Sequence, residues 1–138
     1  MADSVDSQTT TENAQEAGPA PRVLTDGELV ELLGAQQFGV LATVKRSGHP
    51  HLSTVLYQWD PVERIVSIST TEDRLKVRQI RNNPRVALHV TGPDIWSFAV
   101  AEGDAQLSEV TTQAGTGERR LLINIPVSHL YGTALDVT

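Results

Sequence analysis

Three consecutive hydroxyl side chains precede two cationic side chains in the middle of the chain. Ser69, Thr70 and Thr71 end a segment rich in β-forming residues, and Arg74 and Lys76 follow closely. The threonines and the acids after them predict that a helix begins here. Its unpaired N–H groups and the positive end of its dipole would join the cluster. Hydroxyl, amide and cationic donors together are the chemistry that binds a phosphate group.

The same segment has a plainer interpretation. Arg74, Arg78 and Arg81 recur at spacings that place them on one face of the expected helix. Arg85 extends the same positive charge. An ordinary solvated basic helix face would give this pattern, so the spacing alone leaves both interpretations open.

The basic segment stands out because the chain as a whole is acidic. Its 138 residues carry 11 Lys and Arg against 17 Asp and Glu, a net charge of -6, yet residues 74–93 contain no acid. This balance argues against general binding of nucleic acid or anionic membranes. Residues 1–22 are acidic and poor in branched apolar side chains. We therefore predict a disordered acidic tail over 1–22 and one domain over 23–138.

Missing residue types narrow the chemistry further. The chain has no Cys, which excludes disulfides, thiol nucleophiles, iron–sulfur clusters and zinc–thiolate sites, so redox work would need a bound cofactor. No apolar run approaches the roughly 18 residues of a membrane-spanning helix, and the polar N-terminus is unlike a secretory signal. We expect a cytoplasmic protein with no membrane partner. His49 and His51 have no evident third ligand, so no metal is predicted.

A second group of candidate residues lies on the segment 50–59, where alternation gives a strand with two mixed faces. One face holds His51, Ser53, Val55, Tyr57 and Trp59, and the other holds Leu52, Thr54, Leu56 and Gln58. Such faces are typical of a strand that lines a ligand site, and equally of an edge strand or a dimer face. Trp96 and Phe98 share a face of a later strand. They are core or interface residues unless a planar cofactor lies nearby.

The elements that would position these residues are mostly strands. A capping box of Thr25 and Glu28 opens a first helix that Gly34 ends, and a second helix covers about residues 72–81. Strands are predicted at residues 38–44, 50–59, 64–69, 85–91, 96–107 and 121–125, with an extended edge at 127–131. This pattern predicts a mainly β fold, a six-stranded antiparallel β-barrel with short helices. A barrel of this size cannot enclose a large cofactor, so we expect a homodimer with the cofactor between the subunits.

Four stretches of the chain resemble one protein family. Residues 38–44 and 48–55 resemble the first hairpin of the pyridoxamine 5′-phosphate oxidase-like flavoproteins, whose fold is the FMN-binding split β-barrel. Ser69, Arg74, Lys76, Ile80 and the Asn83-Pro84 pair match the family's phosphate-binding segment in type and order. Residues 96–103 and 125–132 are similar to the actinobacterial branch that uses the deazaflavin coenzyme F420. The resemblance covers about residues 24–132.

The resemblance implies a cofactor site, residue by residue. It assigns Arg74, Lys76 and Ser69 to the cofactor's phosphate, and Lys45 to the cofactor tail. It assigns contacts with the ring and its side chain to Pro50, His51, Ser53, Thr54 and Val55. Trp96 and Phe98 would come from the other subunit and cover the ring. The chain departs from this branch at residues 112–118, a short connection where the branch usually has a helical insertion, and this puts the shape of the substrate pocket in doubt.

The resemblance therefore implies an F420-dependent oxidoreductase that transfers a hydride between reduced deazaflavin and a conjugated double bond of a small organic or quinone substrate. One alternative is an FMN-binding oxidase or flavin reductase of the same fold. Another is a carrier of flavin or deazaflavin without catalytic activity. No catalytic residue is identified from the sequence, and Tyr57 and His129 are the two side chains considered as proton donors.

Overall fold

The structure is a computed structural model that describes residues 20–136. In this range it contains the helices α2 (Asp26–Ala35) and α3 (Leu75–Asn82). The longer strands are β2 (Phe38–Val44), β3 (Pro50–Leu56), β5 (Ile65–Thr71), β6 (Arg85–Thr91), β7 (Phe98–Asp104) and β10 (Arg119–Tyr131). The shorter strands are β1 (Arg22–Val23), β4 (Gln58–Asp60), β8 (Gln106–Leu107), β9 (Thr111–Thr112) and β11 (Thr133–Ala134).

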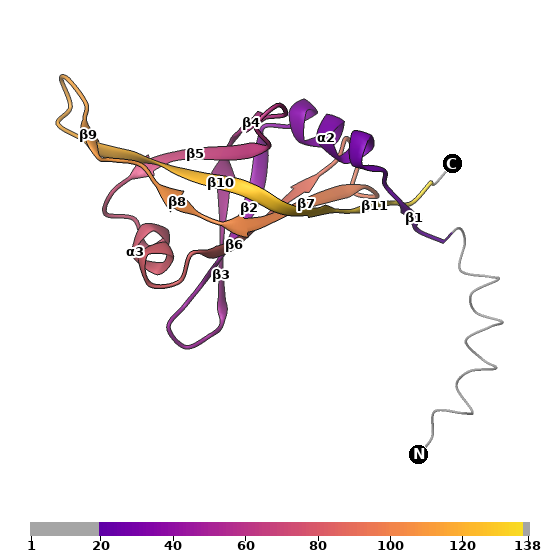
Figure 1. Cartoon of the computed structure of the whole chain (residues 1–138), viewed down its shortest axis with the longest axis horizontal. Helices are drawn as coiled ribbons and strands as arrows, with labels where there is room; N and C mark the ends of the chain where they lie inside the picture. The colour runs from indigo at the N-terminus through magenta and orange to yellow at the C-terminus, as the bar shows by residue number, and fades with distance from the viewer. Residues whose placement is uncertain (1–19, 137–138) are drawn as a thin grey trace, which may run out of the picture.

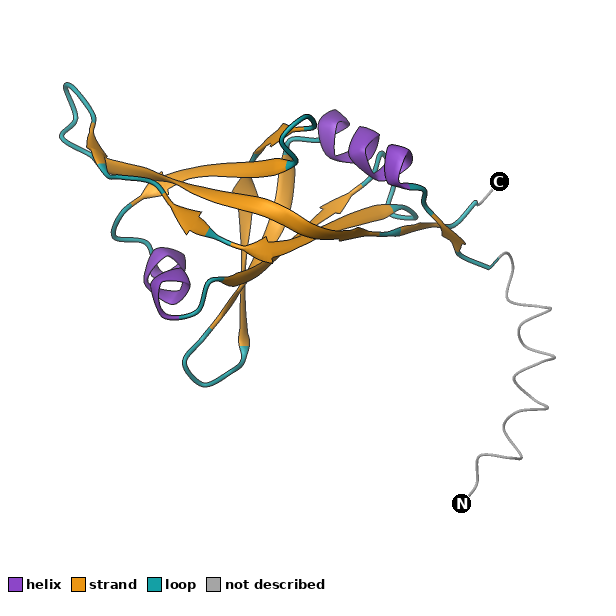
Figure 2. Ribbon diagram, viewed as in Figure 1, coloured by secondary structure: helices purple, strands orange, loops and turns teal. Residues whose placement is uncertain are grey.

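The principal sheet is antiparallel and curls into a half-barrel (Figures 1 and 2). Its strands lie in the order β3-β2-β6-β7-β10-β5-β4, and β8 and β9 pair with β10 beside this path. The two end strands, β3 and β4, are consecutive in the chain and are separated by Tyr57 alone. The ends of the sheet are thus brought together, which confirms the predicted mainly β, split-barrel fold.

The core fills the concave side of the curl. Leu41, Ile68, Leu88, Ile123 and Ile125 are among its almost fully buried side chains, and each comes from a strand of the principal sheet. Alternate residues of β2, β3 and β6 face inward and are buried or half-buried, while the residues between them lie on the convex side. A half-buried sheet of this kind gives the period-2 pattern from which the strands were predicted.

The first helix begins as predicted. The backbone N–H of Glu28 donates to the Thr25 hydroxyl at 3.2 Å, and the Thr25 N–H donates to the Glu28 carboxylate at 2.9 Å. This is the complete capping box. The helix runs through Gly34 to Ala35, one residue further than expected.

The second helix begins later than predicted, at Leu75 rather than near residue 72. Thr71 is the last residue of β5, and the Glu72 N–H continues the ladder by donating to the Arg119 carbonyl at 2.9 Å. The Glu72 carboxylate accepts from Arg119, and the Asp73 carboxylate accepts from the Thr71 hydroxyl. The acids that looked like a helix start therefore have other partners, and Arg74 becomes the residue that precedes the helix.

The strand boundaries differ from the predictions at several places. The predicted strand 96–107 is divided at Ala105 into β7 and β8, and β5 extends to Thr71. Residues 50–59 form two strands that meet at Tyr57, and Trp96 lies in a turn before β7 rather than on the strand. The segments 121–125 and 127–131 belong to one strand, β10, which is not an edge. It pairs with β5 up to Pro126 and with β7 from Val127 onward. Pro126 has no N–H to donate to a ladder, and the register shifts just after it.

In the part of the chain that the structure describes, neither helix is long and apolar enough to cross a bilayer. Most of the predicted tail, residues 1–19, lies outside the described residues. Within the predicted tail, Arg22 belongs to β1 and pairs with Glu28 and Asp136. The division into a tail and a domain stays a prediction.

Candidate functional site

A cavity of about 490 Å³ opens along the seam between β3 and β5. Residues 54–56 of β3 form one wall, and residues 68–71 of β5 form the other. Arg74, Lys76, Glu118 and Arg120 close the end nearest α3. The cavity thus gathers Ser69, Arg74, Lys76, Thr54 and Val55, five of the predicted cofactor residues, from three separate elements.

Lys76 is the most unusual of these residues because it is a buried cation. Only 8% of the residue is exposed. Within residues 20–136 its ammonium has no carboxylate partner and no side-chain hydrogen bond, and the same holds for the guanidinium of Arg74. Burial away from water lowers the pKa of Lys76, and the charge of Arg74 lowers it further. A buried cation without a partner costs free energy, and an anion in the cavity would relieve this cost.

The inward face of β3 carries two more of the predicted residues. Ser53 Oγ is buried and has no hydrogen-bond partner among the described residues, and Ser53 does not line the seam cavity. The His51 ring lies 3.5 Å from the hydroxyl of Thr43, which donates to the side-chain carbonyl of Gln79 on α3. Thr43 thus links His51 on β3 to Gln79 on α3.

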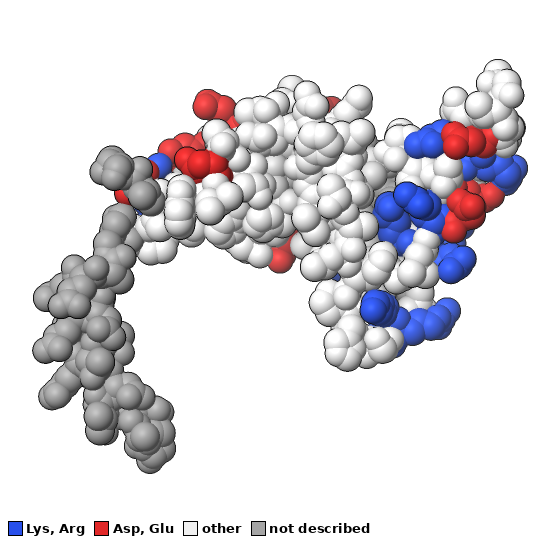
Figure 3. Space-filling view, turned by 180° about the vertical axis from the view of Figure 1, so that it is seen from behind, with Lys and Arg blue, Asp and Glu red and all other residues white. Residues whose placement is uncertain are grey.

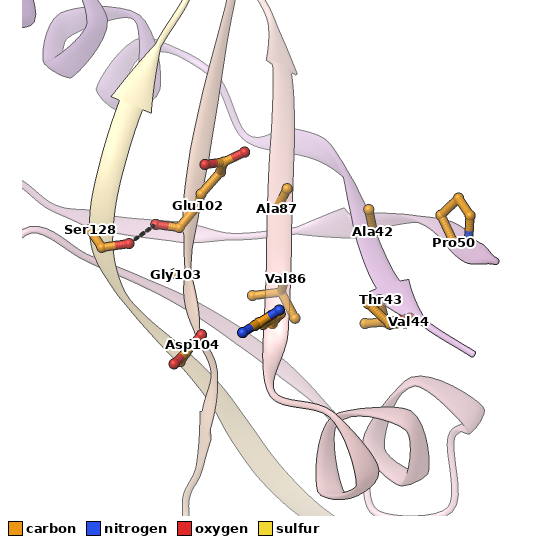
Figure 4. Close-up of a pocket in the computed structure, with 11 residues that line it drawn as sticks. Ala42, Thr43, Val44, Pro50, Val86, Ala87, Glu102, Gly103, Asp104 and Ser128 are labelled. Atoms are coloured by element: carbon orange, nitrogen blue, oxygen red, sulfur yellow. Dashed lines mark hydrogen bonds between the residues drawn. The ribbon is translucent and has the colours of Figure 1, made fainter. Parts of the chain in front are cut away.

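A second cavity, of about 380 Å³, lies on the convex side of the sheet (Figure 4). Ala42, Ala87 and Pro50 form an apolar part of its surface, and Glu102 lies at one side. The Ser128 hydroxyl donates to the backbone carbonyl of Glu102 at 3.2 Å. The structure thus places Pro50 in a different cavity from the five predicted residues that line the seam.

Like His51 and Ser53, the predicted residues Lys45, Trp96 and Phe98 line neither cavity. Lys45 is exposed in the turn between β2 and β3. Trp96 is 45% exposed, and Phe98 stacks on His89 on the convex side, with ring centroids 5.2 Å apart. In a single chain these aromatic side chains do not line the seam.

The two side chains considered as proton donors have different surroundings. The Tyr57 hydroxyl is buried, and burial raises its pKa to about 12, so Tyr57 is unsuited to donate a proton at neutral pH. His129 is exposed, and its Nδ1 lies 3.1 Å from Glu102 Oε1 on the convex side. Among residues 20–136, no group of three His, Asp or Glu side chains is arranged to hold a metal ion.

Charge is unevenly distributed over the surface. Lys and Arg side chains gather at the end of the molecule that carries α3 and β9 (Figure 3). Some Asp and Glu side chains are interspersed among these cations. The opposite end, near α2, is mainly acidic (Figure 3). The seam cavity opens within the basic end, which favours an anionic ligand.

Sequence reasoning missed Arg120 and Glu118, which line the seam cavity. They are remote in sequence from the other lining residues and reach it through the pairing of β10 with β5, where Arg120 lies opposite Thr71. Only the register of β10 against β5 would have placed Arg120 and Glu118 beside the predicted phosphate-binding residues.

Comparison with known proteins gives one family match. Residues 25–120 match the family model described as pyridoxamine 5′-phosphate oxidase. Among solved structures, an F420 reductase is similar with a TM-score of 0.62 and 22% identity, over 72% of this chain and 93% of that one. FAD-binding proteins from Mesorhizobium loti and Mycobacterium smegmatis are similar with TM-scores of 0.63 and 0.64, each at 18% identity. They cover 84% and 85% of this chain, and 97% and 100% of their own. At these identities the solved structures show the fold alone.

Proposed function

The chain belongs to the pyridoxamine 5′-phosphate oxidase family, and on this basis we propose that it is an oxidoreductase that binds coenzyme F420 in the seam between β3 and β5. The observation that carries the proposal is the buried Lys76, which has no partner within residues 20–136, beside Arg74 and Ser69 in that cavity. Such a set fits a phosphate group, because cations and a hydroxyl can each donate to its oxygens. The Ser53 hydroxyl, which has no partner within residues 20–136, lies one residue from the seam lining and would be a second polar contact if the ligand extends along β3.

The protein's contribution would be binding and orientation. Arg74, Lys76 and Ser69 would hold the phosphate, while Thr54 and Val55 would border the ring's side chain. When bound, the deazaflavin supplies the hydride for an electron-poor double bond of an enone or quinone. The walls of the seam would keep ring and substrate in contact and limit the access of water.

A homodimer would complete the site. Phe38, Leu52 and Leu56 lie on the convex side of β2 and β3 and are 60%, 63% and 62% exposed. Large apolar side chains gathered on one face favour an interface. A second copy of the chain seated there would bury them, and its Trp96 and Phe98 would cover the ring.

A flavin cofactor is the second candidate. Two of the similar solved structures are described as FAD-binding proteins. The phosphate-binding set of Arg74, Lys76 and Ser69 would bind the phosphate of FMN as well as that of a deazaflavin. The main proposal and this candidate differ in the ring that the seam accepts.

Parallel titrations of the purified protein with coenzyme F420 and with FMN test the proposal. Fluorescence of Trp59 and Trp96 reports binding. We expect F420 to bind more tightly than FMN, and the loaded, reduced protein to consume an enone or a quinone. Tighter binding of FMN would replace the F420 proposal with the flavin candidate. Failure of both to bind would refute the assignment of the seam.

A further inference from the structure

Arg120 reaches the seam cavity from β10, a strand outside the phosphate-binding segment inferred from the sequence. Its position opposite Thr71 directs the side chain across β5 toward Ser69. About 31% of the side chain is exposed, so the guanidinium lies at the rim of the cavity and is accessible to a ligand.

The guanidinium makes an uneven set of hydrogen bonds. Nε and Nη2 both donate to the single hydroxyl oxygen of Ser69, at 3.3 and 3.2 Å. Nη1 donates to the Glu118 carboxylate at 3.2 Å. The edge formed by Nε and Nη2 has the geometry that binds two oxygens of a carboxylate or phosphate in parallel. Here that edge is held on one neutral acceptor.

The charges around Ser69 are arranged for an anion. Arg74 and Lys76 approach from the α3 side, and Arg120 approaches from β10. Glu118 is the single acid among the residues that line this cavity, and it is paired with Arg120. Three cations against one carboxylate leave the cavity positively charged.

We propose that Arg120 is a third cationic ligand of the bound phosphate group, and that Glu118 is the residue that positions it. On binding, the Nε and Nη2 edge would transfer from the Ser69 hydroxyl to two phosphate oxygens, and the freed hydroxyl would donate to the same group. Glu118 would keep its bond to Nη1 and so hold the guanidinium plane toward the cavity. This inference rests on the proposed function, since it concerns the phosphate of the same cofactor.

The experiment compares probes with and without a phosphate. Dissociation constants are measured for FMN against riboflavin, and for coenzyme F420 against its phosphate-free deazariboflavin. The proteins are the full chain, Arg120→Ala, Arg120→Lys and the neighbouring control Arg119→Ala. Arg119 pairs with Glu72 and does not line the seam cavity. Thermal unfolding of each variant verifies that it folds.

We expect Arg120→Ala to weaken binding of the phosphorylated probe about tenfold or more and to leave the phosphate-free probe within twofold. Arg120→Lys keeps the charge without the planar edge and should give an intermediate loss, which tests the inference even if the alanine variant does not fold. Arg119→Ala should bind like the full chain. Equal losses for both members of a probe pair, or no loss in either Arg120 variant, would overturn the role of Arg120.

Glu118 is tested as a positioning residue by two substitutions. Glu118→Gln keeps an acceptor for Nη1 and removes the negative charge, so phosphate affinity should be retained or increased. Glu118→Ala removes the acceptor and should weaken phosphate binding at unchanged stability. Equal effects of the two substitutions would contradict the positioning role.

Failure of this inference and failure of the proposed function give different results. If the full chain binds a phosphorylated probe and the Arg120 variants bind it equally well, the function stands and the inference falls. If no cofactor binds the full chain, inorganic phosphate is tested by its effect on thermal unfolding. Stabilisation by phosphate that is lost in Arg120→Ala supports Arg120 without the cofactor, and no stabilisation refutes both.

Discussion

The hydroxyl of Tyr57 donates a 2.7 Å hydrogen bond to the backbone carbonyl of Leu33, in the last turns of α2. The backbone N–H of Tyr57 also donates to the Gln37 carbonyl, at 3.1 Å. These two bonds hold Tyr57, the residue between β3 and β4, against the C-terminal end of α2. The position of the seam is thus tied to the first helix.

Replacing Tyr57 by Phe should destabilise the fold without affecting the ligand site. The substitution leaves the buried Leu33 carbonyl without this partner, which costs about 1–3 kcal/mol of unfolding free energy. Urea unfolding measures the loss, and cofactor titration should give an unchanged dissociation constant. A weakened cofactor affinity at unchanged stability would instead place Tyr57 in the site.

Replacing Lys76 by Met should change stability and binding in opposite directions. Met preserves most of the apolar stem, removes a buried cation and so should raise the unfolding free energy at pH 7. Phosphate-dependent cofactor binding should fall by tenfold or more. Arg78→Met, on the exposed face of α3, is the control and should alter stability by no more than about 0.5 kcal/mol.

The stability difference at Lys76 should also depend on pH. The pKa of Lys76 is lowered in the folded chain from its usual 10.5. Between the two values the unfolded chain holds the extra proton, so the stability of the natural chain rises with pH in that range. The advantage of Lys76→Met should therefore be complete below the lowered pKa and shrink as the pH rises toward 10.5. A difference that is constant over this range would contradict the lowered pKa.

Gly103 is required by the close pairing of β7 with β10, where it lies opposite Val127. A Cβ at this position would lie 2.3 Å from the Pro126 carbonyl oxygen, a backbone atom that cannot move aside cheaply. Gly103→Ala should destabilise the fold by about 1–3 kcal/mol. Gly27→Ala is the matched control, since a Cβ there meets nothing within 4 Å, and it should stabilise α2 by about 0.5–1 kcal/mol. Thermal unfolding of both variants provides the comparison.

The proposed homodimer predicts a change of mass when its surface is charged. Leu52→Glu places a carboxylate on the convex side of β3 and should convert a dimer to a monomer, as measured by light scattering after gel filtration. Val62→Glu, at a position 85% exposed in the turn between β4 and β5, should keep the dimer. A natural chain that is already monomeric would refute the dimer itself.

Local patterns predicted the parts of the fold that depend on neighbours in sequence. The capping box of Thr25 and Glu28 and the alternation of β3 are of this kind, and the structure confirms both. The start of α3 was wrong because Glu72 binds Arg119, 47 residues away, instead of capping the helix. Arg120 was missed for a similar reason, since its place in the seam depends on the pairing of β10 with β5.

The single residue between β3 and β4 also determines how the seam can open. On one side of Tyr57, β4 is hydrogen-bonded to β5. On the other side, β3 is hydrogen-bonded to β2 instead. The two walls of the seam, β3 and β5, are therefore closest near Tyr57, and β3 moves away from β5 toward the β2–β3 turn. A ligand in the seam can enter as far as Tyr57, and passing this residue would require breaking its bonds to Leu33 and Gln37. The bonds of one residue outside the phosphate-binding cluster therefore limit how deeply a ligand can enter the seam.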